Sequence, residues 1–553
     1  MTEPRYREGT LGGARVDVQR RADGTLLVRR DQPLRDYPPR ITDRLVHWAR
    51  EAPQRSFVAR REQGGRWRHI SFAQMLERAR AIGQALLDRQ LSAERPLVIL
   101  SENDLEHATL AAAALYSGVP FAAISPAYSL VSKDYGKLRH IVALLTPGLV
   151  FAADGERYAA AIEAAVPADI ELVVSARAPS RRRATPFAEL LATRATPAVD
   201  AANSAIGPDS IAKFLFTSGS TKAPKGVINT HRMLCSNQQV LAQEMPFLAE
   251  EPPVLVDWLP WNHTFGGNHN YGIAMYNGGT LHIDDGKPVP GLFAETLRNL
   301  REIAPTIYFN VPKGFEELAA ALRDDAGLRE RFFSRLQLLF SAGAGMPDPV
   351  AHAIYRIAEQ HCGERIGIYT GLGMTETAPY ALGVARVGEL PAAIGTPGPG
   401  ITLKLVPNGG KLEVRYRGPG VTPGYWRAPE LTRASFDDEG FFISGDAIRF
   451  IDESHPSRGF VFDGRVAEDF KLNTGTWVSV GPLRTLALAH GAPYVQDVVV
   501  TGHDRSEVGL LVFLRLERCR ELAALPSDAP VDRVIADPSV RAFIGQLLDR
   551  INS

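Results

Sequence analysis

Residues 214–227 read Phe214-Leu215-Phe216-Thr217-Ser218-Gly219-Ser220-Thr221-Lys222-Ala223-Pro224-Lys225-Gly226-Val227. An apolar run leads into small residues, most of which carry hydroxyls, and lysines follow. Hydroxyls and backbone N–H groups can converge on phosphate oxygens in such a loop, while an ammonium group adds positive charge. The Walker pattern is excluded, because Pro224 stands where its second glycine belongs and Gly226 follows Lys225. The stretch predicts a strand followed by a phosphate-binding loop, and a solvated Ser/Thr-rich turn is the alternative.

The composition is that of an ordinary globular protein. The 553 residues include 62 Lys+Arg and 62 Asp+Glu, so the formal charge is zero and a dedicated nucleic-acid or anionic-membrane binder is not expected. Apolar residues make up 45% of the chain, which is enough for a large core and several domain-sized units.

The cysteines and the N-terminal residues favour a cytoplasmic protein. Cys235, Cys362 and Cys519 are odd in number and far apart, so they build neither a disulfide framework nor a CxxC metal site. Residues 1–13 lack the apolar centre of a signal peptide. The uncharged stretch 108–132 is interrupted by glycine and proline, so we read it as a buried helix and strand, and expect no integral membrane segment.

Alternating patterns in the first half predict βαβ units. Ser71 and Gln74 form a capping-box pattern before a run with helical periodicity. Residues 97–100 are strand-like, 105–116 helical and 119–123 apolar, which favours a buried parallel sheet. Residues 176–210 have little periodicity and are interpreted as a surface crossing.

The later half changes to antiparallel patterning. Residues 401–406 and 411–416 are strand-like, and Pro407-Asn408-Gly409-Gly410 between them has hairpin chemistry. Ser444-Gly445-Asp446 is expected in a turn between two strands, from which a side chain can reach a ligand. A further small α/β unit is expected from about Ala467.

Further motifs follow the hydroxyl-rich loop along the chain: Asn262-His263, Ser341-Ala342-Gly343-Ala344, Thr370-Gly371-Leu372-Gly373-Met374-Thr375-Glu376, Ser444-Gly445-Asp446 and Asp463-Gly464-Arg465. In this order they resemble the AMP-forming acyl-CoA synthetase and adenylating-enzyme superfamily, which includes the coumarate-CoA ligases and luciferases. Residues 257–263 and 464–471 are similar to the feruloyl-CoA synthetase branch in particular.

The resemblance implies an α/β fold with two domains. Residues 1–464 would form a large N-terminal adenylating domain of parallel α/β subdomains with a small antiparallel β subdomain. Residues 465–553 would form a small mobile α+β C-terminal domain. That domain looks shortened and incomplete, since no Gly-Lys segment resembles the family's terminal catalytic lysine.

The resemblance also implies an activity. With ATP and Mg²⁺, a carboxylic acid would become an acyl-adenylate, and coenzyme A would then take the acyl group with release of AMP. The preferred acid is a hydroxycinnamate such as ferulate, and fatty or other aryl acids are alternatives. The resemblance also allows a homodimer, and the other partners would be small molecules: the carboxylic acid, ATP and coenzyme A.

Site roles carry over by matching motif positions. The expected catalytic residues are Lys225, His263, Thr375 and Glu376, of which Glu376 would also hold Mg²⁺. The expected nucleotide contacts are Thr217, Ser218, Gly219, Ser220, Thr221, Lys225, Gly343, Thr370, Gly371, Thr375, Asp446 and Arg465. The expected acid pocket comprises Trp261, His263, Phe309, Gly343 and Gly371, and Lys471 and Gly475 are expected near coenzyme A.

Two other functions stay open. Lys222 replaces a usual glycine and Ala467 a usual charged residue, which favours a nucleotide-binding homologue with impaired turnover. A peptide-synthetase-type adenylation module would need an acidic anchor, for which Asp257 is available, and a carrier domain, which the sequence lacks. Zinc at His263 and His269 is not favoured, because neither a cysteine nor a carboxylate lies beside them at ligand spacing.

Overall fold

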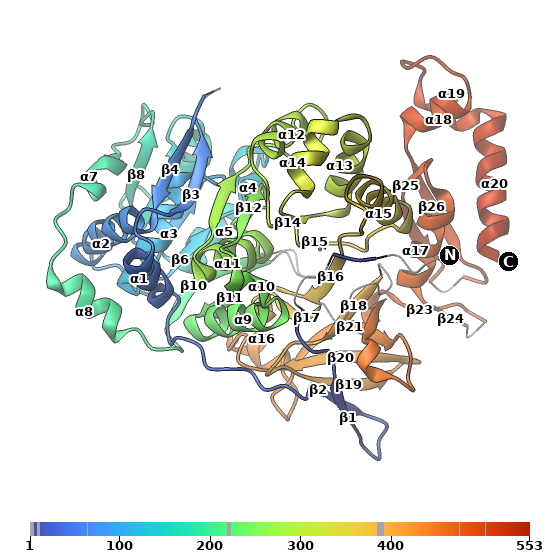
Figure 1. Cartoon of the computed structure of the whole chain (residues 1–553), viewed down its shortest axis with the longest axis horizontal. Helices are drawn as coiled ribbons and strands as arrows, with labels where there is room; N and C mark the ends of the chain where they lie inside the picture. The colour runs from blue at the N-terminus through green and yellow to red at the C-terminus, as the bar shows by residue number, and fades with distance from the viewer. Residues whose placement is uncertain are drawn as a thin grey trace.

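A seven-stranded sheet has Thr217 and Lys225, which flank the hydroxyl-rich stretch, on its two outermost strands at one edge. The computed structural model describes residues 5–7, 11–62, 65–217, 223–383, 392–474, 476–503 and 505–552. In Figure 1 this sheet lies among the blue, teal and green elements. Neighbouring strands in this sheet are parallel, except for one antiparallel pair at the edge, in which Thr217 lies opposite Lys225. The strand order is β11 (Lys225–Thr230), β10 (Ile211–Thr217), β6 (Phe121–Ala123), β5 (Leu97–Leu100), β7 (Leu149–Asp154), β8 (Glu171–Ala176) and β9 (Thr185–Pro186).

Helices cover this sheet as the periodicity predicts. The Ser71 side chain accepts a hydrogen bond from the Gln74 N–H, which confirms the capping box of α2 (Phe72–Asp88). The buried α3 (Leu105–Ser117) ends at Gly118, whose φ of 73° is accessible to glycine at little cost. No helix in the described part of the chain is long and apolar enough to cross a membrane.

The segment 176–210 runs over the surface as expected, since most of its residues are exposed or partly exposed. It contains α7 (Phe187–Leu191) and α8 (Pro197–Ala205). Thr196 caps α8 by accepting a hydrogen bond from the Ala198 N–H, and proline occupies the first turn. Capping chemistry starts this short helix although its sequence has little apolar periodicity.

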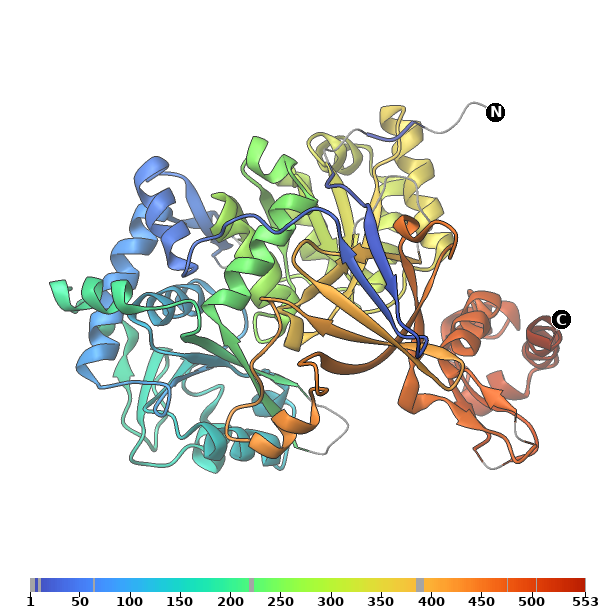
Figure 2. The same cartoon turned by 90° about the horizontal axis from the view of Figure 1, so that it is seen from below.

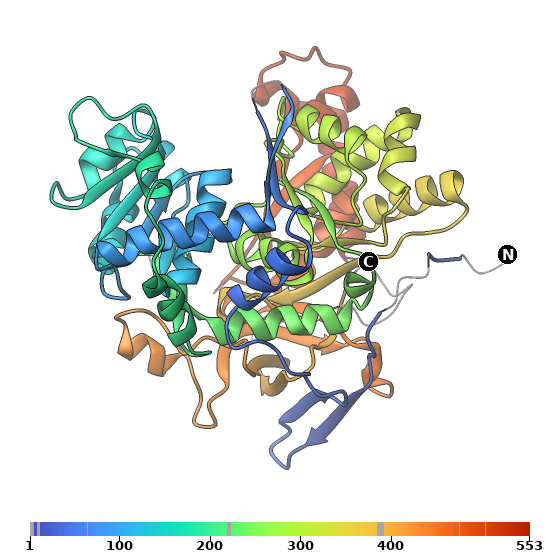
Figure 3. The same cartoon turned by 60° about the vertical axis from the view of Figure 1, so that its left-hand side comes forward.

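A second, eleven-stranded sheet joins the middle of the chain to its N-terminus. Figures 2 and 3 show the blue N-terminal hairpin beside the orange strands of this sheet, and β2 pairs antiparallel with β19. The order is β1 (Val16–Arg20), β2 (Leu26–Arg30), β19 (Thr402–Asn408), β20 (Lys411–Arg417), β21 (Phe442–Phe450), β22 (Phe460–Arg465), β18 (Ala393–Pro397), β17 (Tyr380–Gly383), β16 (Ile368–Gly373), β15 (Leu338–Ser341) and β14 (Ile307–Asn310). The hairpin predicted around residues 407–410 is confirmed.

Ser444-Gly445-Asp446 does not form a turn between strands, contrary to the sequence prediction. The tripeptide lies inside the single strand β21, where the pairing register shifts between Asp446 and Ile448. Gly445 has a φ of 72°, which lets the strand bulge without ending.

A four-stranded sheet and further helices complete the N-terminal part. The sheet order is β12 (Val254–Asp257), β13 (Thr280–Ile283), β3 (Ser56–Arg61) and β4 (Trp67–Ser71). The other helices are α1 (Thr42–Glu51), α4 (Ala127–Leu130), α5 (Gly136–Leu145), α6 (Ala159–Ala165), α9 (His231–Glu244), α10 (Phe247–Glu250), α11 (Tyr271–Asn277), α12 (Phe293–Glu302), α13 (Pro312–Asp324), α14 (Ala326–Phe333), α15 (Asp348–Cys362) and α16 (Pro429–Ala434).

The C-terminal unit stands to one side of the molecule, red in Figure 1. It contains β23 (Phe470–Lys471), β24 (Trp477–Val478), α17 (Val480–Gly491), β25 (Val495–Thr501), β26 (Gly509–Leu514), α18 (Leu516–Leu522), α19 (Val531–Ala536) and α20 (Pro538–Asn552). Lys411 on β20 pairs with Asp469 at 2.5 Å, and Arg515 pairs with Glu316 on α13 at 2.8 Å. Ion pairs thus bridge this unit to both α13 and the second sheet.

A buried ion pair fixes the N-terminal hairpin to α9. The Arg30 guanidinium contacts the Glu244 carboxylate at 2.7 Å with both side chains almost fully buried, and it also donates to the Pro397 carbonyl. Removing one member of such a pair leaves the other charge without compensation in a low dielectric.

We expect Glu244→Ala to lower the free energy of unfolding by roughly 3–5 kcal/mol, because Arg30 would stay buried and unpaired. The double variant Arg30→Met/Glu244→Leu should recover most of this loss. Urea titration followed by tryptophan fluorescence measures both. Asp209→Ala, which breaks the exposed Arg232–Asp209 pair, is the control and should cost less than about 1 kcal/mol. Equal losses in Glu244→Ala and this control would contradict the expectation.

Candidate active site

Lys225, Tyr425 and Glu376 come together at the edge of the first sheet. Lys225 begins β11, and its ammonium lies 5.5 Å from the centre of the Tyr425 ring. The Tyr425 hydroxyl donates a hydrogen bond of 2.8 Å to the Glu376 carboxylate. Tyr425 therefore contacts both Lys225 and Glu376, which are 151 positions apart in the chain. The predicted phosphate residues Ser218, Gly219, Ser220 and Thr221 lie outside the described residues.

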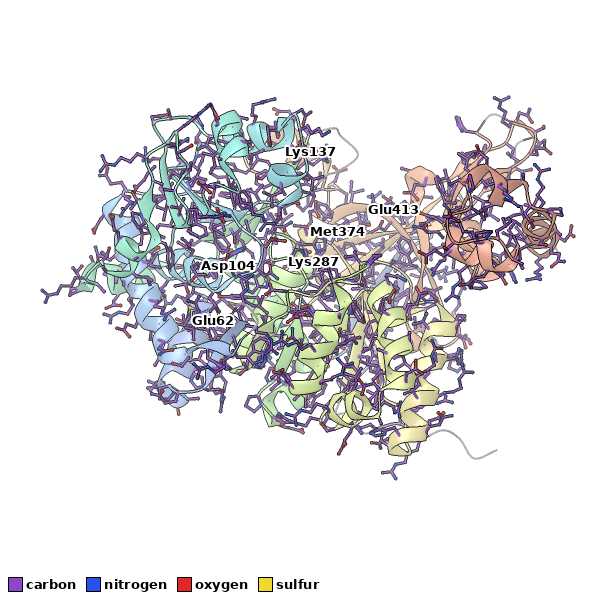
Figure 4. The ribbon with its side chains drawn as sticks, turned by 90° about the horizontal axis from the view of Figure 1, so that it is seen from above. Glu62, Asp104, Lys137, Lys287, Met374 and Glu413 are labelled. Carbon is purple, nitrogen blue, oxygen red and sulfur yellow. The ribbon has the colours of Figure 1, made fainter. Side chains whose placement is uncertain are left out.

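The buried Glu376 is fixed in position by hydrogen bonds to its side chain and to its backbone. It lies in the 3₁₀ turn Thr375–Thr377 and is 7% exposed, as is Thr375. Its backbone carbonyl accepts a hydrogen bond from the Thr422 N–H at 2.8 Å. Figure 4 labels the adjacent Met374 near the middle of the view, directly above Lys287. The backbone and Tyr425 together orient this carboxylate.

Asp446 and Arg465 are brought together by strand pairing. They lie opposite each other on β21 and β22, and the guanidinium is 3.2 Å from the carboxylate. The Asp446 side chain is 8% exposed and that of Arg465 is 54% exposed. Burial raises the pKa of Asp446 to about 6, with Arg465 opposing the shift. This carboxyl therefore titrates just below neutral pH.

The predicted glycine positions lie at the ends of neighbouring parallel strands. Thr370 on β16 lies opposite Ser341 on β15. A side chain at Gly371 would come within 3.2 Å of the Phe340 ring, and Gly343 has a φ of 87°. Gly371 thus lets the strand approach the aromatic residues described next.

Five buried rings from four elements form an aromatic cluster: Phe265, His269, Phe309, Phe340 and Tyr380. The His269 ring lies 5.3 Å from Phe265, 5.1 Å from Phe309 and 5.7 Å from Phe340, measured between centroids. Nε2 of His269 and the hydroxyl of Tyr380 are buried without a hydrogen-bond partner among the described residues. An unpartnered buried polar group costs free energy, and a bound ligand that forms hydrogen bonds with Nε2 and the hydroxyl would remove that cost.

The π-helix Phe265–Asn270 supplies two of these rings, and its local structure depends on glycine. A Cβ on Gly266 would lie 2.3 Å from the Leu259 carbonyl oxygen, and one on Gly267 would lie 2.2 Å from that of Trp261. Any side chain at these positions would push the helix off the preceding loop. Asn103 fixes the loop from the other side, by donating to the Leu259 carbonyl and accepting from the Trp261 N–H.

Trp261 and His263 are not part of the aromatic cluster. The Trp261 ring packs against His107 and Tyr271, at 5.1 and 5.3 Å, on a different set of elements. His263 has an exposed side chain, and its Nδ1 accepts from the Phe265 N–H. Partial desolvation lowers the pKa of His263. Of the residues expected in the acid pocket, Phe309 belongs to the aromatic cluster and Gly371 lies beside it.

The remaining predicted positions are near the C-terminal unit. Lys471 lies on β23 opposite Trp477, close in sequence to the end of β22. Gly475 lies outside the described residues, so its expected contact with coenzyme A stays a prediction.

Tyr425, Phe340, Tyr380 and Asn103 were missed by the sequence analysis. None of them belongs to a motif with its own signal, and Phe340 alone adjoins one. Each reaches the site from a separate element.

The fold, with a large α/β part and a small C-terminal unit, is that of adenylate-forming enzymes. The benzoate CoA ligase from Burkholderia xenovorans LB400 superposes with a TM-score of 0.69 at 21% identity, covering 92% of this chain and 93% of that one. A family model described as AMP-binding enzyme matches residues 45–426. The chain belongs to this family.

Two curated relatives have different printed activities. The long-chain-fatty-acid–CoA ligase of Escherichia coli O6:H1 is 30% identical over 307 residues, covering 53% of this chain and 50% of its own length. The anthranilate–CoA ligase of Pseudomonas aeruginosa is 30% identical over 305 residues, covering 53% of this chain and 54% of its own. The matches thus span about half the length of these relatives.

The raised pKa of Asp446 yields a stability test. Its folded pKa of about 6 exceeds the unfolded value of about 4, so the folded protein binds more protons between these pH values. The stabilising contribution is complete below pH 4 and is lost as the pH rises through 6. We expect Asp446→Asn, which stays neutral, to match the wild-type melting temperature at pH 4 and to exceed it at pH 7. A wild type that is the more stable at pH 7 would show that the Arg465 pair outweighs burial.

Proposed function

We propose that the protein uses ATP to activate an aryl carboxylic acid, a hydroxycinnamate such as ferulate in the first place, and transfers the acyl group to coenzyme A. The observation that carries the aryl assignment is the aromatic cluster with its two unpartnered polar groups. Family membership supports the nucleotide chemistry. AMP and pyrophosphate would be the other products.

The polar groups of the cluster suit a phenolic ring. Nδ1 of His269 lies 2.8 Å from the Asn270 side-chain oxygen, which assigns the ring proton to Nδ1 and leaves Nε2 as an acceptor. Burial lowers the pKa of His269 to about 4, so the ring stays neutral. Nε2 can accept a phenolic O–H, while the Tyr380 hydroxyl can donate to an adjacent ether oxygen. The surrounding rings offer edge and face contacts to a flat acid.

Lys225, Thr217, Thr375 and residues 218–221 are assigned to the phosphates in this proposal, with Gly343, Thr370 and Gly371 along the nucleotide. Asp446 and Arg465 are assigned to the ribose hydroxyls. Mg²⁺ would be held by Glu376 and by phosphate oxygens, since Mg²⁺ commonly takes few protein ligands in nucleotide sites. The carboxylate fits this role, because Tyr425 occupies only one of its oxygens. No group of three or more potential metal-binding side chains occurs among the described residues.

The proposed chemistry has two steps. An oxygen of the acid forms a bond to the α-phosphorus as the bond to pyrophosphate breaks, and Lys225 neutralises charge on the phosphates. The sulfur of coenzyme A then attacks the acyl carbon and AMP leaves with the bonding electrons. His263, exposed beside the π-helix, is assigned as a gate near the reacting carboxylate. Lys471 and Gly475 are assigned to the coenzyme A side.

We expect Lys225→Ala and Glu376→Gln each to reduce ferulate-dependent pyrophosphate exchange by roughly 10²–10³-fold, because the first removes a positive charge at the phosphates and the second weakens the proposed Mg²⁺ ligand. Tyr425→Phe should have a smaller effect in the same direction, since it frees the Glu376 carboxylate. Lys137→Ala is the matched control, because Lys137 also stacks on a tyrosine, Tyr128, at 5.2 Å. Retention of exchange in both main variants would refute the phosphate assignment.

Substrate choice is tested separately. We expect ferulate and coumarate to have higher kcat/KM values than octanoate. His269→Phe should reduce the ratio of kcat/KM for ferulate to kcat/KM for cinnamate by about tenfold, because one hydrogen bond is lost. His282→Phe is the control, since His282 is another buried neutral histidine but lies on β13. Preference for octanoate over every aryl acid would overturn the aryl proposal in favour of a fatty acid.

AMP release measured with and without coenzyme A separates the alternative functions. A ligase needs coenzyme A for rapid turnover, whereas an adenylation module would form adenylate from an amino acid. A nucleotide-binding homologue would bind ATP and release no AMP.

A further inference from the structure

Lys213 is a buried lysine that the proposed mechanism does not use. It lies on strand β10, between the edge strand β11 and β6, is 4% exposed, and forms no ion pair with any described residue. Its ammonium donates one hydrogen bond of 3.0 Å, to the carbonyl of Gly267 in the π-helix, and lies 5.4 Å from the Phe121 ring. A buried cation without a counter-charge is uncommon and calls for compensation.

Lys213 and Gln238 together hold three consecutive carbonyls of the π-helix. Lys213 takes that of Gly267, and the Gln238 side-chain nitrogen donates to those of Asn268 and His269 at 2.9 and 3.2 Å. π-Helical turns are less favourable than α-helical ones and persist where other contacts support them. Strand β10 and helix α9 thus provide this support from outside the helix.

A small cavity of about 30 Å³ lies against the same side chains. Four of the residues that line it have unused hydrogen-bonding capacity. Oε1 of Gln238, Oδ1 of Asn268 and Nε1 of Trp261 are buried without a partner, and Lys213 has donors to spare. The cavity therefore presents two donors and two acceptors.

This set matches one water molecule. The cavity exceeds the roughly 10–15 Å³ that a water molecule needs, and a buried water typically makes two to four hydrogen bonds. Water can accept from Lys213 and Trp261 and donate to Gln238 and Asn268. A halide would satisfy the donors but would face two oxygen acceptors, and an apolar occupant would satisfy none of the four.

We infer that the cavity holds one ordered water, and that Lys213, through this water and the Gly267 carbonyl, is a positioning residue for the π-helix that carries Phe265 and His269. Lys213 affects acid binding through the position of the π-helix, and it contacts neither the acid nor ATP. This inference rests on the proposed function for its kinetic consequence, because the aromatic cluster is there assigned to the acid.

The charge state of Lys213 adds a pH signature. Burial lowers its pKa to about 7. The titratable groups that line the same cavity are His107 on α3, whose pKa burial lowers to about 4, and Tyr271 on α11, whose pKa burial raises far above its usual value. Neither changes charge between pH 6 and 9. The ammonium holds the Gly267 carbonyl more strongly than the neutral amine does, so acid binding should weaken as the pH rises through 7.

The kinetic test uses Lys213→Met, which keeps an unbranched apolar stem but removes the terminal ammonium group. We expect the KM for ferulate in pyrophosphate exchange to rise about tenfold, with the KM for ATP changed less than twofold, and the step near pH 7 in kcat/KM for ferulate to disappear. Tyr271→Phe is the control, because it alters the same cavity wall but its hydroxyl bonds only the Ala108 carbonyl. A parental KM for ferulate and an unchanged pH profile in Lys213→Met would overturn the inference, as would equal changes in both KM values.

A second measurement does not depend on activity or on the folding of a variant. A crystal structure of the wild-type protein should show one density peak within hydrogen-bonding distance of Lys213, Gln238, Trp261 and Asn268. Crystals soaked in bromide should show no anomalous peak there. An empty cavity or a bromide peak would overturn the water site. Wild-type protein inactive with every aryl acid would instead refute the proposed function and leave this crystallographic test in force.

Discussion

The close approach of the π-helix to the loop before it is the constraint on which the site depends. Gly266 and Gly267 press against the backbone of residues 259–261 at distances where any Cβ would collide. One face of the helix then presents Phe265 and His269 to the aromatic cluster. Its Gly267 carbonyl accepts a hydrogen bond from Lys213 on strand β10. A helix displaced by one side chain would lose both sets of contacts, because packed interiors have little free volume to absorb a shift.

The charged side chains of the candidate site are held in position by contacts with other side chains. Tyr425 orients Glu376 and stacks on Lys225, so opposite charges are kept near each other without direct neutralisation. Asp446 pairs with Arg465 at the end of β22, directly before the C-terminal unit. A ligand that takes hydrogen bonds from Asp446 would compete with this pair, which would couple binding at the carboxylate to the position of the chain leaving β22.

Local patterns predicted local structure well where one physical signal dominated. Ser71 with Gln74 gave a helix start, and Pro407 to Gly410 gave a hairpin, because capping and turn chemistry act within a few residues. The prediction failed at Ser444-Gly445-Asp446, since a glycine with positive φ serves a bulge as readily as a turn. At residues 176–210, predicted as a surface crossing, Thr196 and Pro197 start a helix that periodicity alone does not reveal.

The sequence by itself determined the family, through motifs in a fixed order, and the two-part α/β organisation. It also singled out Lys225, Glu376 and Asp446 by residue type and context. Tertiary structure alone decided that Tyr425 joins the first two, that Trp261 packs away from the aromatic cluster, and that His269 and Tyr380 lie within it with unpartnered polar atoms. The physical reason is range: motifs record contacts between neighbours in the chain, whereas these contacts join separate strands and helices whose packing fixes them only once the whole core has formed.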